Sequence, residues 1–179
     1  NFGQSTLLNP DLQFSGNNEV ATVKLDIFGE IVVTLGTVPQ GQGHETTLAQ
    51  IVASQTGVPF DQITVIHGDT LPTPYGFGTG SSRSSVVLMP SAWVAGKLMR
   101  DKILGIAARQ LGVVPEKLEI GDGKVFAKEN KGQSIALMEI VRTAYGAIHL
   151  LPENMEPGLE VTGYFINPNI DAITMTYGY

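Results

Sequence analysis

The stretch Pro39-Gln40-Gly41-Gln42-Gly43-His44-Glu45-Thr46-Thr47 decides the organisation of this 179-residue chain. Gly41 and Gly43 flank Gln42, so the backbone can adopt a left-handed conformation or approach a ligand closely on either side of this amide. Apolar residues at helical spacing follow and predict a helix over Thr47–Thr56. The N-terminus of a helix presents unpaired N–H groups, which suit a polar or anionic ligand. The Gln42 carboxamide both donates and accepts hydrogen bonds, so it can bind an oxo or carbonyl group without adding charge.

The composition excludes several classes of protein. With 11 basic and 17 acidic residues the net charge is -6 and the pI is about 4.9, which argues against a nucleic-acid surface. The sequence has no cysteine, so it contains no disulfide, iron–sulfur site or thiolate metal site. The apolar runs are far too short to span a bilayer, and no signal peptide is visible. The chain does not begin with Met and stops abruptly at Tyr179, so we expect a piece of a longer polypeptide.

The hydrophobic pattern predicts strands on both sides of the first helix. Alternating apolar residues from Ala21 to Ile27 indicate a half-buried strand, and Ile31–Leu35 is predicted as its hairpin partner after a turn at Gly29-Glu30. Gly57 is placed to end the helix. Ile63–Ile66 is predicted as a third short strand.

The segment from Leu71 to Met89 has no clean period and is rich in Gly, Pro and Ser, so we expect a functional loop. Pro90 suits the first turn of a second helix, predicted over Ala92–Leu111 and ended by Gly112. Trp93 is interpreted as a core residue. The apolar stripe that this helix is expected to bury comprises Ala95, Leu98, Met99, Ile103, Ile106, Ala107 and Leu111.

The remaining pattern completes an α+β prediction. Leu118–Phe126 is predicted as a hairpin that turns at Asp122-Gly123, and Ser134 as the cap of a third helix that ends near Gly146. The fold class expected is α+β, with helices packed on a mixed β-sheet. We divide the chain into a loose polar leader (1–18), a ligand-binding domain (19–150) and an extended C-terminal segment (151–179) that leads to a missing part of the protein.

An ordered set of motifs, spread over nearly the whole chain, carries a resemblance to a known family. The set comprises Gly41-Gln42-Gly43-His44-Glu45-Thr46, Ala49-Gln50-Ile51-Val52-Ala53, Gly68-Asp69-Thr70, Pro74-Tyr75-Gly76, Gly78-Thr79, Ser82-Arg83-Ser84, Gly121-Asp122-Gly123 and Gly158-Leu159-Glu160. In this order the motifs resemble the molybdenum-cofactor-binding subunit of the xanthine dehydrogenase and aldehyde oxidase family, which includes the carbon-monoxide dehydrogenase large chain. A lone Gly-Gln-Gly would be weak evidence, whereas the ordered set is specific.

The resemblance implies a cofactor site and an activity. Members of this family hydroxylate aldehydes and aromatic N-heterocycles with oxygen from water, at a molybdenum held by a molybdopterin that is in some cases a dinucleotide. By resemblance Gln42 is a catalytic residue whose amide bonds an oxo ligand of the metal. The cofactor-binding residues implied are Gln40, Gly41, Gln42, Gly43, Thr79, Gly80, Ser81, Ser82 and Ser84, the serines and their backbone N–H groups forming a nest for the phosphate. No metal ligand is predicted in the chain itself.

Each candidate residue also has a purely structural interpretation. Gln42 could satisfy neighbouring backbone as a loop amide, and the serines from Ser81 to Ser85 could form a flexible linker. For His44 we favour a structural histidine over a metal ligand, because no partner ligand lies at suitable spacing. For Asp69 we favour a turn-capping role. Arg83 could bind a phosphate or substrate carboxylate, or pair with a structural carboxylate, and both alternatives stay open.

The chain also departs from the family pattern. Val86–Pro90 stands where the family has small residues, so the exact phosphate contacts can differ. The family's general-base glutamate has no match, and the other lobe of the molybdenum subunit is missing, as are the FAD and iron–sulfur modules. We therefore expect the fragment alone to be inactive, with the remaining lobes, the iron–sulfur and flavin subunits and a small-molecule substrate as its partners. A cytoplasmic location is expected. The alternative function is a non-catalytic cofactor-binding or assembly module that kept the fold.

Overall fold

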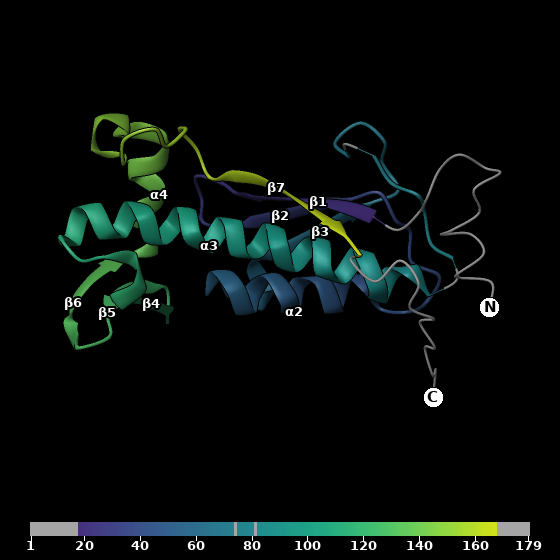
Figure 1. The fold of residues 1–179 in the computed structure, drawn as a ribbon, viewed down its shortest axis with the longest axis horizontal. Helices are drawn as coiled ribbons and strands as arrows, with labels where there is room; N and C mark the ends of the chain where they lie inside the picture. Colours follow the sequence, from purple (N-terminus) through teal and green to yellow (C-terminus); the bar gives the residue numbers. More distant parts are fainter. Residues whose placement is uncertain (1–17, 74, 81, 168–179) are drawn as a thin grey trace.

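A computed structural model describes residues 18–73, 75–80 and 82–167, and its main sheet has four strands in the order β3-β2-β1-β7. β1 (Asn18–Leu25) and β2 (Ile31–Leu35) form the expected antiparallel hairpin. β3 (Ile63–His67) lies parallel to β2, and β7 (Glu160–Ile166) lies antiparallel to β1. The sheet is therefore mixed, and the pairing of β7 with β1 brings the two ends of the described chain side by side (Figure 1).

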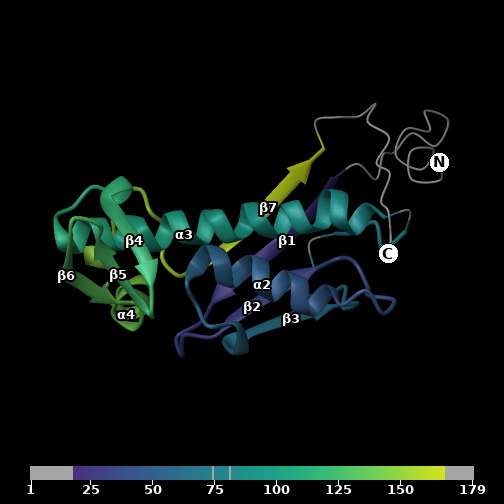
Figure 2. The ribbon, with the colours of Figure 1, turned by 90° about the horizontal axis from the view of Figure 1, so that it is seen from below.

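Two helices cover one face of this sheet. α2 (His44–Thr56) connects β2 to β3, and α3 (Met89–Leu111) runs beside it and also packs against β1 and β7 (Figure 2). α3 continues from a π-helical turn at Ser84–Leu88, which gives the second helix a wider first turn. The core consists of the apolar residues between these helices and the sheet. Both helices end as predicted, because Gly57 and Gly112 adopt left-handed conformations with φ of 70° and 64°.

A second, smaller unit lies at the C-terminal end of α3 (Figures 1 and 2). It is a three-stranded antiparallel sheet of β4 (Leu118–Gly121), β5 (Lys124–Ala127) and β6 (Asn130–Ala136). α4 (Leu137–Gly146) follows β6 and packs against α3. Short 3-10 turns stand at Phe60–Gln62, Pro115–Lys117 and Ile148–Leu150. The α+β prediction with three helices and a mixed sheet is thus confirmed.

Four sequence predictions are wrong in detail. Ser134 lies within β6 and does not cap α4, whose N-cap is Ala136. Trp93 is 47% exposed, with the Lys97 ammonium 5.7 Å from its ring centroid, and Leu98 is 42% exposed, so neither belongs to the core. β1 ends at Leu25, two residues before the predicted end of the strand at Ile27. The rest of the α3 stripe is buried or partly buried as expected.

The predicted division of the chain is only partly covered by the described residues. Residues 1–17 and 168–179 lie outside the described residues, so the division into leader, domain and C-terminal segment stays a prediction, although β7 falls within the predicted extended segment. None of the described helices is long and apolar enough to cross a membrane.

Candidate functional site

The two stretches that the sequence singled out meet in one pocket. Its volume is about 440 Å³, and it lies where the loop after β2 meets the loop that precedes α3. Gln40 and Gln42 line it from the first loop. The residues that line it from the second loop and the following turn are Thr79, Gly80, Ser82, Ser84, Ser85 and Met89, while His44 and Thr47 come from the start of α2.

Strand topology explains why segments so far apart in sequence come together. β2, α2 and β3 form a strand–helix–strand unit in which the two strands are parallel neighbours. The loops after β2 and after β3 therefore leave the same edge of the sheet, at the carboxyl ends of the strands. This edge is the usual ligand position in sheets with parallel strands.

The turn around Gln42 is shaped by the two glycines that the sequence predicted to be special. Gly41 and Gly43 have φ of 97° and 71°, a region that side chains other than glycine adopt at a cost. The backbone N–H of Gln40 donates to Oε1 of Gln42. Because a backbone N–H can only donate, this bond fixes the orientation of the carboxamide and leaves the NH₂ group of Gln42 as the remaining donor.

The N-terminus of α2 opens toward the same pocket. Gly43 occupies the N-cap in a left-handed conformation and supplies no side-chain cap. His44, the first helical residue, is buried, and its Nδ1 has no hydrogen-bond partner among the described residues. Burial lowers the pKa of the His44 imidazole, an effect that the neighbouring Glu45 carboxylate partly opposes. His44 is therefore a neutral polar group beside the pocket.

The other wall of the pocket is held against the segment after β2 at three successive points. The hydroxyl of Thr73 donates to the carbonyl oxygen of Asp69 at 2.7 Å and lies 3.3 Å from that of Leu35 at the end of β2, and the hydroxyl of Thr79 donates to the carbonyl oxygen of Val38. Between these contacts the backbones of Gly36 and Gly76 touch, since a Cβ on either would lie 2.3–2.4 Å from the Cα of the other. The long loop is thus folded closely along residues 35–38.

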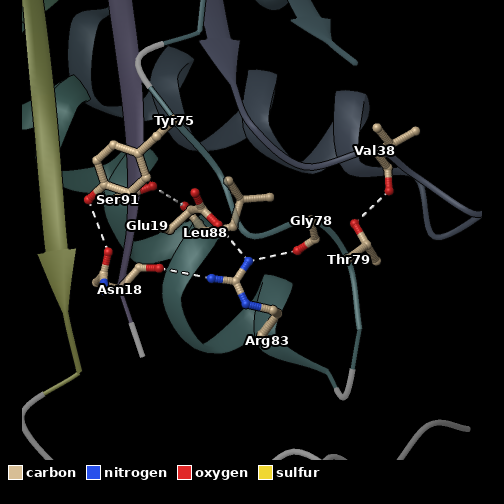
Figure 3. A network of polar contacts seen from close by, with 9 residues as sticks. All are labelled: Asn18, Glu19, Val38, Tyr75, Gly78, Thr79, Arg83, Leu88 and Ser91. Atoms are coloured by element: carbon tan, nitrogen blue, oxygen red, sulfur yellow. Dashed lines mark hydrogen bonds and ion pairs between the residues drawn. The ribbon is translucent and has the colours of Figure 1, made fainter. Parts of the chain in front are cut away.

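Arg83 anchors the end of this loop to β1. Its Nη1 donates to the buried Glu19 carboxylate and to the carbonyl oxygen of Gly78, and its Nη2 donates to the carbonyl oxygen of Asn18 (Figure 3). The hydroxyl of Tyr75 donates to Oδ1 of Asn18 at 2.9 Å and adds a second link. Of the two alternatives left open for Arg83, the structure shows the ion pair with a structural carboxylate, that of Glu19.

Two polar atoms at the pocket lack partners within the described part of the chain. Oγ of Ser84 and Nδ1 of His44 are buried without a hydrogen bond, and both residues line the pocket. A buried polar group that remains unsatisfied costs about 1–3 kcal/mol, so a bound polar group or a water molecule at the pocket would stabilise these two atoms. The described lining residues offer hydroxyl, amide and backbone groups and no carboxylate. This donor set fits a neutral or anionic polar ligand.

The predicted site residues are placed as follows. Gln40, Gln42, Thr79, Gly80, Ser82 and Ser84 line the pocket. Gly41 and Gly43 shape the turn, and Ser81 lies outside the described residues. His44, Thr47, Ser85 and Met89 were not predicted as lining residues, although the strand–helix–strand spacing could have placed the start of α2 at the pocket.

The other candidates serve the structure. Asp69 caps the turn after β3, since its Oδ1 accepts the N–H of Leu71 at 2.9 Å, as favoured. Glu45 pairs with His67 at 2.8 Å, and the pKa of its carboxyl is lowered by its own backbone N–H and by the hydrogen bond with His67. Within the described ranges no three His, Asp or Glu residues cluster as metal ligands.

Comparison with known proteins places this chain in a family. A family model described as the molybdopterin cofactor-binding domain matches residues 2–179. The carbon monoxide dehydrogenase large chain of Hydrogenophaga pseudoflava is 35% identical over 159 residues, which are 89% of this chain and 19% of that protein. The nicotine 6-hydroxylase large subunit of Paenarthrobacter nicotinovorans is 34% identical over 145 residues, which are 81% of this chain and 18% of that protein.

Solved structures agree with the sequence relatives. CO dehydrogenase from Oligotropha carboxidovorans superposes with a TM-score of 0.79 at 35% identity, over 88% of this chain and 19% of that one. Quinoline 2-oxidoreductase from Pseudomonas putida 86 gives a TM-score of 0.78 at 34% identity, over 84% and 19% of the two chains. This chain spans about a fifth of the length of these relatives. It belongs to the molybdopterin cofactor-binding domain family and is homologous to the large chains of molybdenum hydroxylases.

Proposed function

We propose that this pocket is where the chain holds molybdopterin. The residues assigned to it are Gln40, Gly41, Gln42 and Gly43 from the segment after β2, and Thr79, Gly80, Ser82 and Ser84 from the later loop, with Ser81 assigned from its sequence position alone. The observation that carries the proposal is the meeting of Gln42 with the Thr79–Ser84 loop in one pocket, beside the unpartnered Oγ of Ser84. Hydroxyl and backbone N–H donors suit the phosphate of the cofactor, and the amides suit its polar ring edges.

The whole protein, on this proposal, is a molybdenum hydroxylase that oxidises an aldehyde or an aromatic N-heterocycle with oxygen derived from water. The names of the relatives, which include a nicotine 6-hydroxylase and a quinoline 2-oxidoreductase, support an N-heterocycle. The remaining lobes of the molybdenum subunit and subunits that carry FAD and iron–sulfur clusters are the proposed partners, and the cytoplasm is the proposed location. Relatives named as large chains or subunits of complexes support the multi-subunit part of the proposal.

The chain's own residues bind and orient the cofactor, which when bound supplies redox-active molybdenum and oxygen-transfer chemistry. Gln42 is the residue to which we assign a catalytic role. Its carbonyl oxygen is occupied by the N–H of Gln40, so its NH₂ group is the part that can donate toward the cofactor. A Cβ at Gly41 or Gly43 would project into open space. Because glycine has no Cβ, this space beside Gln42 stays free for a ligand.

The test replaces Gln42 in the full-length protein with its partner subunits. Gln42→Ala removes one donor and should cost about 1–3 kcal/mol, or about 5- to 150-fold in turnover or cofactor retention. Gln42→Glu keeps the bond from the Gln40 N–H but replaces the donor with an anionic acceptor. It should therefore be worse than Gln42→Ala, unless the new carboxyl stays protonated.

The measurements are molybdenum content, pterin content and turnover, with Gln50→Ala as the matched control. Gln50 is an exposed glutamine on α2, outside the pocket, so its replacement should change none of the three. If both Gln42 variants match the wild type, Gln42 is only a loop amide and the proposed catalytic role is wrong. If pterin is absent from the wild-type protein as well, the proposed cofactor site is wrong.

A further inference from the structure

Arg83 stands between two residues that line the pocket, yet its own side chain reaches the start of β1 (Figure 3). Nη1 donates to Oε2 of Glu19 and, over 2.7 Å, to the carbonyl oxygen of Gly78. Nη2 donates to the carbonyl oxygen of Asn18 over 2.8 Å. The guanidinium also lies over the ring of Phe77, 5.6 Å from its centroid. One side chain thus joins its own loop to the first strand of the sheet.

Burial makes this arrangement costly. The Glu19 side chain is fully buried, and that of Arg83 is only 8% exposed. A buried ion pair is often no more stabilising than well-packed apolar residues of the same volume, so stability alone gives weak reason for one here. The arginine instead fixes the relative positions of its partners, because its planar guanidinium group holds several acceptors in a fixed geometry.

The loop that Arg83 anchors contains a strained position next to it. Ser82 has a φ of 60°, a left-handed conformation that is uncommon outside glycine and persists only where surrounding contacts hold it. On the other side Ser84 begins the π-helical turn, with its hydroxyl buried at the pocket. The backbone N–H of Arg83 also donates to the carbonyl oxygen of Gly80 at 3.0 Å. The conformation of both serines therefore depends on where Arg83 is fixed.

We propose that Arg83 is a positioning residue for the cofactor: through Glu19 and Gly78 it holds Ser82 and Ser84 in the conformation that binds the cofactor's phosphate. This inference rests on the proposed cofactor site. Arg83 acts by geometry and not by charge, since the Glu19 carboxylate neutralises it within the pair. The two modes of action predict opposite signs for Glu19→Gln. If Arg83 attracted the phosphate by charge, removal of the carboxylate would tighten binding, whereas loss of the anchor weakens it.

The experiment compares Arg83→Lys, Glu19→Gln and a control in the full-length protein with its partner subunits. The control is Arg100→Lys, because Arg100 also donates from Nη1 to a backbone carbonyl, that of Gln55 at 3.2 Å, but joins α3 to α2 outside the pocket. Each variant is dialysed at a temperature that lies a fixed number of degrees below its own Tm, and the pterin that it retains is measured. A general loss of stability then does not affect the comparison between variants. Amide exchange at residues 79–84 is followed in the cofactor-free protein.

The result expected is loss of pterin about 10- to 100-fold faster in both Arg83→Lys and Glu19→Gln, the range typical of residues that orient a ligand's direct contacts. Amide exchange at residues 79–84 should accelerate in the same two variants, while Arg100→Lys behaves as wild type in both measurements. Wild-type retention by Arg83→Lys, tighter retention by Glu19→Gln, or equal loss in Arg100→Lys would overturn the inference while leaving the cofactor site standing. A wild-type protein that holds no pterin would overturn the proposed function and this inference together.

Discussion

The contact between Gly36 and Gly76 predicts a steric test of how the pocket is built. A Cβ at residue 76 would lie 2.3 Å from the Cα of Gly36, and one at residue 36 would lie 2.4 Å from the Cα of Gly76. Carbon atoms in favourable contact lie about 3.5–4.0 Å apart, so Gly36→Ala or Gly76→Ala must separate the two backbones by about 1 Å. Neither glycine has a left-handed φ, so the cost is steric and not conformational.

The expected cost follows from two contributions. Overpacking of a tight contact costs about 1–3 kcal/mol. Separation of the loops also breaks the bond from the Thr79 hydroxyl to the Val38 carbonyl oxygen, worth about 0.5–1.5 kcal/mol. We therefore expect each alanine variant to lower the free energy of unfolding by about 2–4 kcal/mol. The double variant should cost clearly less than the sum, because one separation relieves both clashes.

Urea unfolding followed by circular dichroism measures these differences, and amide exchange at residues 75–80 shows whether the loop detaches before the core unfolds. Gly146→Ala is the control, since a Cβ there meets no atom within 4 Å and the residue has no left-handed φ. It should stay within about 0.5 kcal/mol of wild type. If Gly36→Ala and Gly76→Ala also stay within that range, with unchanged exchange in the loop, the close backbone contact does not hold the pocket wall.

Three further outcomes test the core, the pH response and the pocket. Ile103→Ala should cost about 2–5 kcal/mol in urea unfolding because its side chain is fully buried, whereas Leu98→Ala, at an exposed position, should cost less than about 1 kcal/mol. Burial lowers the pKa of His44 below its ordinary value of about 6.5, so stability should be complete above that pH and fall as the pH drops through the lowered pKa; a shallower decline in His44→Gln checks this. Gly80→Leu projects into open space at the pocket, so it should leave urea unfolding unchanged while pterin content in the full-length protein falls.

The periodic parts of the fold could be predicted because their signals are local. Alternation placed the β1–β2 hairpin, and helical spacing placed α2, α3 and α4. Gly57 and Gly112 marked the helix ends because left-handed C-terminal residues are most often glycine.

The sequence predictions failed where the spacing of apolar residues does not indicate what a residue pairs with or packs against. Asn130-Lys131-Gly132 begins β6 without any alternation, since these residues are exposed and lie where the register with β5 shifts. Trp93 and Leu98 are apolar residues on α3 that the packed elements do not cover. Hydrophobic character alone could not distinguish them from the buried stripe.

The pocket shows a different limit, because its wall is specified by contacts between residues far apart in sequence. Thr73, Thr79 and Arg83 each make a polar contact with a residue of the β1–β2 hairpin or of the segment just after it, from 38 to 65 positions away. No periodicity in the sequence of the loop indicates these partners. For this reason the sequence left two interpretations of Arg83 open.

Topology explains why the anchors gather at one place. Antiparallel pairing sets Ala21 beside Leu35, so the start of β1 and the end of β2 lie at the same edge of the sheet. Parallel pairing sets Leu35 beside His67, so the chain leaves β3 at that edge too. The loop after β3 therefore runs beside both the end of β2 and the start of β1, and its contacts alternate between the two: Thr73 and Thr79 lie at residues 35–38, while Tyr75 and Arg83 bond to Asn18. Glu19 is paired with Phe165 of β7, and a shift of one residue in this pairing would move the Glu19 side chain to the other face of the sheet and remove the anchor for Arg83. The geometry of the pocket wall thus depends on the pairing of a strand that does not itself line the pocket.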